Sequence, residues 1–165
     1  FTTGAPIDDR AVSAIVGVRR GETRGDLLDA VARREVRSAL ALVPHVLQQP
    51  KVSGVTVVMA LTTQTLALGW AQAAIAERLL APAQLQKAFF DLLKDGGGAF
   101  TGRPWNEAVQ AWTRAPRWSA AAVDRALEAL LAADVALKES TVSGDEQIIA
   151  TLVLALCTPD ARAAA

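Results

Sequence analysis

The sequence predicts an all-α protein, a bundle of helices joined by short loops. Apolar residues make up 52% of the 165 residues, and alanine and leucine, which favour helix, are abundant among them. Along most of the chain apolar side chains recur at every third or fourth position, and no stretch alternates as a strand would. A chain of this length can bury about 70% of its extended surface, so its core needs no disulfide or metal.

Three helices are expected in the N-terminal third of the chain, over residues 8–17, 25–35 and 36–49. The first begins at Asp8, a good N-cap residue, and ends at Gly17. Pro44 lies inside the third, where its missing N–H and its clash with the preceding turn are expected to kink or break the helix. A loop rich in Pro, Ser and Gly follows over residues 48–54.

The next helix, expected over residues 52–80, has no charged residue between Lys51 and Glu77. About 20 apolar residues suffice to cross a bilayer, so this run is long enough for a membrane span. It also carries polar side chains whose burial in hydrocarbon would cost free energy: Ser53, Thr56, Thr62, Thr63, Gln64, Thr65 and Gln72. Its one tryptophan, Trp70, does not mark both ends of a span. The centre of a soluble bundle is favoured, and a membrane helix is the alternative.

Four more helices are expected, over residues 83–95, 103–115, 120–140 and 143–157. Ser119 caps the third of these. Its core-facing stripe is predicted to contain Val123, Leu127, Leu130 and Leu137, widened by Leu131 and Val135. The last helix opens with a capping box between Ser143 and Glu146. Its apolar residues cover about half of the circumference, as in a buried helix: Ile148, Ile149, Leu152, Val153, Leu156 and Cys157.

Charge and residue content argue against several classes of function. Lysine plus arginine and aspartate plus glutamate number 17 each, so the formal net charge is zero, unlike that of an autonomous nucleic-acid binder. One histidine and one cysteine cannot assemble a zinc site of the usual ligand types. Gly96–Gly98 are followed by Ala99 and Phe100, instead of the Lys and hydroxyl residue of a phosphate loop. His45 has no marked acid or nucleophile as partner. We therefore expect no catalytic, cofactor-binding or metal-binding residues and no enzymatic activity.

Cysteine use and the N-terminal residues predict a cytoplasmic protein. Cys157 lies in an apolar helix and is expected to be a buried thiol, which fits a reducing compartment. The first ten residues lack the basic end and apolar core of a signal peptide. Because the chain begins with Phe1 rather than Met, we expect it to be part of a longer protein.

Two sets of residues are candidates for contacts with a partner. Trp105 and Trp112 lie with Val109 on one helix face. Asp134 interrupts an apolar stripe, and Lys138 lies four residues on, the favourable orientation for an ion pair along one helix. This pair is either half-buried at the edge of the stripe or a polar contact to a neighbouring subunit or helix, and both interpretations stay open.

A series of motifs runs from Ile7 to Cys157 in a distinctive order. Three early helices are built on Ile7, Val12, Val16 and Gly17, on Leu27 or Leu28 with Asp29 and Ala30, and on Ala39 with Leu40. Later come the helix PWNEAVQAW, a loop with Trp118, a helix ending in Ala133, Asp134 and Lys138, and the closing helix that ends at Cys157. In this order the motifs resemble the C-terminal region of the delta subunit family of the bacterial DNA polymerase III clamp loader.

This resemblance implies a structural role in DNA replication. In the family, an N-terminal domain contacts and opens the ring-shaped sliding clamp, and a C-terminal helical collar joins delta to the other loader subunits. The implied partners are the C-terminal domains of delta-prime and of the gamma/tau ATPases, with at most indirect contact to DNA and none to a membrane. The sliding clamp would be reached only through a domain upstream of Phe1. The uncharged helix and the face with Trp105 and Trp112 are the expected interaction surfaces.

The resemblance also divides the chain into three parts. Residues 1–20 would be the end of the second, lid-like domain, 21–158 the collar, and 159–165 a frayed tail. The chain departs from the family at Pro44 and along the uncharged run, where relatives commonly carry basic residues. A small helical domain that is membrane-associated or enzymatic, or another protein-interaction module, is the alternative.

Overall fold

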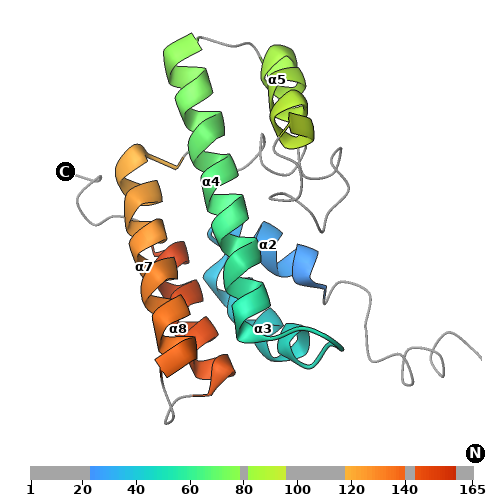
Figure 1. Ribbon diagram of the computed structural model, residues 1–165, viewed down its shortest axis with the longest axis vertical. Coiled ribbons are helices and arrows are strands. Elements are labelled where there is room, and N and C mark those ends of the chain that lie inside the picture. Colours follow the sequence, from blue (N-terminus) through green and yellow to red (C-terminus); the bar gives the residue numbers. More distant parts are fainter. Residues whose placement is uncertain (1–22, 79–81, 96–117, 140–143, 159–165) are drawn as a thin grey trace, which may run out of the picture.

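The computed structural model describes residues 23–78, 82–95, 118–139 and 144–158. Within these ranges the chain forms six helices and no strand (Figure 1): α2 (Arg24–Ala32), α3 (Val36–Leu47), α4 (Gly54–Arg78), α5 (Pro82–Asp95), α7 (Ala120–Glu139) and α8 (Asp145–Cys157). The all-α class predicted from the sequence is confirmed. The helices expected over 8–17 and 103–115, the domain boundary after residue 20 and the tail over 159–165 lie outside the described residues.

Helix α4, the longest of the described helices with 25 residues, lies antiparallel to α7 (Figure 1). Gly54 at the start of α4 faces Leu137, whereas Gly69 in its second half faces Val123. A Cβ atom on Gly69 would lie 3.0 Å from Val123 Cγ1, so glycine allows the two helices to approach closely here. α4 also contacts α2, α5 and α8.

The other helices close the core around α4. α3 contacts both α2 and α8, and α8 contacts α7. α5 lies beside the far end of α4 (Figure 1), where Phe89 meets Trp70 with ring centroids 5.3 Å apart. Every described helix, α4 included, contributes at least one side chain that is at most 2% exposed: Leu27, Val46, Leu61, Phe89, Leu130 and Ile149. Burying one such side chain stabilises the fold by about 1.5–3 kcal/mol.

Pro44 was expected to kink or break α3, and the break does not occur. The helix runs through Pro44 from Val36 to Leu47. Pro44 lies in the last turn, and its carbonyl accepts a hydrogen bond from Gln48 N at 3.1 Å, which continues the helical pattern. Val43 and Val46, on either side of it, are fully buried, so packing against the neighbouring helices holds the helical conformation.

The buried stripe of α7 runs mainly through alanines: Ala122, Ala126, Leu130 and Ala133. Leu131 and Val135 are 65% and 42% exposed, so the prediction that they widen the core stripe is wrong. Small side chains let α7 lie close to its neighbours, and three residues expected in the core stripe, Val123, Leu127 and Leu137, are only partly buried at its edge. Ser119 caps the helix as predicted, since its Oγ accepts a hydrogen bond from Ala122 N at 3.1 Å.

Helix α8 begins at Asp145, and its N-cap residue is Gly144 without a side-chain cap. The predicted capping box between Ser143 and Glu146 therefore has the wrong register, and Ser143 itself lies outside the described residues. The Asp145 carboxylate instead accepts a hydrogen bond of 2.8 Å from Gly54 N, in the first turn of α4. It thus stabilises the positive end of a neighbouring helix. The predicted buried side of α8 is confirmed, with Ile148 only partly buried: Ile149, Leu152, Val153, Leu156 and Cys157.

Alanine substitutions at the adjacent residues Leu130 and Leu131 test which side of α7 is buried. Leu130 is 2% exposed, so Leu130→Ala should lower the free energy of unfolding by about 2–5 kcal/mol, the cost of a cavity in a core. Leu131→Ala, the matched control, should change it by less than about 0.5 kcal/mol. Urea unfolding of the two variants measures both values, and equal losses would mean that α7 is rotated relative to the structure.

Candidate functional site

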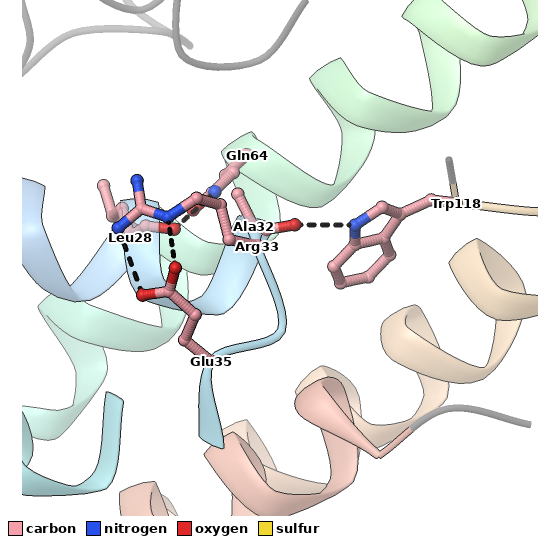
Figure 2. A network of polar contacts seen from close by, with 6 residues as sticks. All are labelled: Leu28, Ala32, Arg33, Glu35, Gln64 and Trp118. Atoms are coloured by element: carbon pink, nitrogen blue, oxygen red, sulfur yellow. Dashed lines mark hydrogen bonds and ion pairs between the residues drawn. The ribbon is translucent and has the colours of Figure 1, made fainter. Parts of the chain in front are cut away.

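A polar network joins α2 to α4 and to the residues just before α7. Figure 2 shows its two buried donors: Gln64 Nε2 donates a hydrogen bond of 2.7 Å to the Leu28 carbonyl oxygen, and Trp118 Nε1 donates one of 3.1 Å to that of Ala32. Ala32 ends α2, and the last carbonyls of a helix have no partner within it. Because the donors are 1% exposed, losing either bond would leave a buried polar group unpaired.

The turn after α2 centres on Arg34, whose φ is 57°. Arg34 N donates to Val31 O and Glu35 N donates to Ala30 O, both at 2.9 Å, which are the two bonds of a Schellman motif. A positive φ favours glycine, so arginine costs conformational energy here. The guanidinium lies over the Trp118 ring, 4.6 Å from Cζ to the centroid, and this cation–π contact offsets part of that cost.

Two titratable side chains near this turn, Glu35 and Cys157, have shifted pKa values, and each shift follows from the surroundings of the side chain. Arg33 Nε lies 2.8 Å from Glu35 Oε1 (Figure 2), and this hydrogen bond lowers the pKa of Glu35. Cys157 is buried, and burial raises the pKa of its thiol to about 11, although the charge of Arg34 opposes the shift. A protonated thiol is a weak nucleophile at neutral pH, so Cys157 has the properties of a core residue, as predicted. His45 is exposed in the last turn of α3.

Within the described part of the chain, no group of three or more His, Cys, Asp or Glu side chains is placed to hold a metal ion.

A groove of about 490 Å³ lies between α4 and α7. It is lined from α4 by Val58, Met59, Thr62 and Thr63, and from α7 by Leu127, Leu130, Leu131 and Asp134. Met59 and Leu131 are each 65% exposed. Leu66 lies seven residues after Met59, and Val135 four after Leu131, so both continue the same sides of their helices. We call the following residues the α4–α7 face: Met59, Thr62, Leu66, Leu127, Leu131 and Val135.

Of the predicted interface residues, Asp134 and Lys138 are described. Lys138 Nζ lies 2.6 Å from Asp134 Oδ2, and the two side chains are 61% and 30% exposed. Asp134 is thus partly buried at the edge of the groove, whereas Lys138 is exposed, so the ion pair predicted along one helix is present. Trp105 and Trp112 lie outside the described residues.

Sequence patterns anticipated exposed apolar surface on α4 but not the residues that form it. The spacing of Leu127, Leu130 and Leu131 does not say which leucine faces inward, because all three fall within one broad apolar arc. The alanines at 122, 126 and 133 were the available signal, since small residues mark close helix contacts.

Comparison of the chain with models of protein families, with curated proteins and with solved structures finds no match. The resemblance to the delta subunit family therefore rests on the order and spacing of its motifs.

Trp118→Phe tests the contribution of the polar network. The variant keeps an aromatic ring but loses the hydrogen bond to Ala32, leaves a small cavity and weakens the contact with Arg34. We expect the free energy of unfolding to fall by about 1–3 kcal/mol. Trp70→Phe, at a partly buried position against Phe89, is the control and should cost less than about 1 kcal/mol. Similar losses in urea unfolding would show that the Trp118 hydrogen bond contributes little.

Proposed function

We propose that this chain is the C-terminal collar region of the delta subunit of the bacterial DNA polymerase III clamp loader. It would be a cytoplasmic, non-catalytic module that joins the loader subunits, which together place the sliding clamp on primed DNA during replication. The order of motifs from Ile7 to Cys157 supports this proposal, and the all-α fold is compatible with it.

The structural observation that supports an assembly role is the exposed α4–α7 face. Contiguous apolar surface on a soluble protein commonly marks an interaction site. Met59, Leu66, Leu131 and Val135 are each at least 42% exposed and border one groove or continue its walls. The formal net charge is zero, which suits a protein partner better than a polyanion. An assembly role is therefore favoured over a catalytic one.

A membrane-associated domain is the second candidate, because Gly54–Glu77 is long and apolar enough to cross a bilayer. The antiparallel packing of α7 argues against it. Gly54 faces Leu137 and Gly69 faces Val123, so Glu128 lies at the depth of the middle of this segment. Glu128 is exposed. A carboxylate at that depth in lipid costs about 2.5–3.5 kcal/mol or more. Partition into membranes after lysis without detergent would favour this second candidate.

Co-purification tests the collar proposal. The chain should form a complex with the gamma/tau ATPase subunits and delta-prime of a clamp loader, and removal of the C-terminal domains of those subunits should abolish it. It should not bind the sliding clamp, because the clamp-contacting domain of the family lies upstream of the matching region. Size-exclusion chromatography of each pairwise mixture measures both outcomes. Tight binding to the clamp, with none to the ATPase subunits, would contradict the proposal.

A further inference from the structure

We propose that the α4–α7 face binds an amphipathic helix whose apolar stripe is bordered by lysine or arginine. This inference rests on the proposed function in one respect, that the chain is an assembly module, and it specifies the chemistry of the partner segment. It follows from the shape of the groove, from its apolar residues and from the charges on its α7 side.

The shape and the apolar residues fit a helix. The groove lies between two antiparallel helices, and amphipathic helices bind such grooves with apolar side chains at three- and four-residue spacing. Met59 and Leu131 stand on opposite walls and are both 65% exposed. Leu66 extends the apolar surface along α4 and Val135 extends it along α7.

The charges on the α7 side select a cationic partner. Asp124 and Glu128 are exposed one turn apart, seven and three residues before Leu131 and so on the same side of α7, and neither has an ion-pair partner within the described ranges. Arg125, the exposed cation between them, already makes an interaction of its own. Lys138 is already paired with Asp134. The wall formed by α4 has no charge between Lys51 and Glu77. The helix dipole does not account for Glu128, which lies well beyond the first turn of α7. Two like charges one turn apart repel each other, and basic side chains of a partner would relieve this repulsion.

The same carboxylates disfavour other occupants. Nucleic-acid phosphates and anionic lipid headgroups would be repelled by the carboxylates of Asp124 and Glu128 beside the α4–α7 face. A second copy of this chain would bring its own Asp124 and Glu128 to the contact. A protein helix with basic residues beside its apolar stripe is the occupant that satisfies both the apolar surface and its charged border.

Two synthetic helices provide the test. Both carry leucines at i, i+3, i+4 and i+7 spacing and have the length of α7; lysines border the stripe in one, and glutamates in the other. We expect the full chain to bind the lysine peptide at least about tenfold more tightly, as measured by fluorescence anisotropy in about 50 mM salt. Leu131→Gln should weaken this binding by about tenfold or more, whereas Leu154→Gln, at an exposed leucine on α8, should change it by less than about twofold.

The charged border is tested separately. The double variant Asp124→Asn/Glu128→Gln should weaken binding of the lysine peptide by about tenfold and reduce its dependence on salt. Equal affinity for both peptides would overturn the proposal, as would equal effects of Leu131→Gln and Leu154→Gln. Self-association of the chain that is lost in Leu131→Gln would identify a second copy as the occupant. Leu131-dependent binding to vesicles of anionic lipid would identify a membrane. Either result would overturn the proposal.

Failure of this inference can be distinguished from failure of the proposed function. If the loader subunits bind Leu131→Gln as well as they bind the unchanged chain, the collar proposal stands and the α4–α7 face is not its interface. If no loader subunit binds the chain, the peptide measurements still decide whether the face accepts a cationic helix.

Discussion

Helix α4 contacts α2, α5, α7 and α8, so the position of each of these helices depends on the side of α4 that it covers. Several helices can pack on different sides of α4 because it has no charged residue between Lys51 and Glu77 that would have to stay in contact with water. Gly54 and Gly69 also let α7 approach α4 closely at two points, at Leu137 and at Val123. The lack of charge also has a second consequence: beside α7, α4 presents an apolar surface on which Met59 and Leu66 are exposed.

Apolar packing alone would allow α4 to slide or rotate against its neighbours, and the buried polar contacts limit that freedom. Gln64 reaches the Leu28 carbonyl only in one register of α4 on α2, and Trp118 reaches Ala32 only if the start of α7 lies beside the end of α2. Gln64 Oε1 is buried and has no hydrogen-bond partner within the described residues, so this arrangement also costs some folding free energy. A shift of one helical turn would leave the Gln64 amide without its acceptor as well.

The all-α class, most bounds of the described helices and the buried side of α8 were predictable because they follow from local periodicity. The errors occurred where partners distant in sequence decide. Pro44 stays helical because Val43 and Val46 are buried, and Asp145 bonds to Gly54, which is 91 residues away, rather than within a capping box. Leu130 and Leu131 differ in burial because alanines set the close contacts of α7. The Asp134–Lys138 pair was predictable from spacing, whereas the groove beside it depends on how α4 and α7 pack.

Native-state hydrogen exchange of α4 tests most directly whether this helix forms the core of a bundle in water. In buffer without detergent, the amides from Val57 to Ala71, which include most of its buried residues, should exchange only through global unfolding. Their opening free energies should equal the free energy of unfolding from urea denaturation and match those of buried positions in α8. Exchange of α4 at lower free energies than α8, or protection that requires detergent, would contradict the central place of α4 in the core.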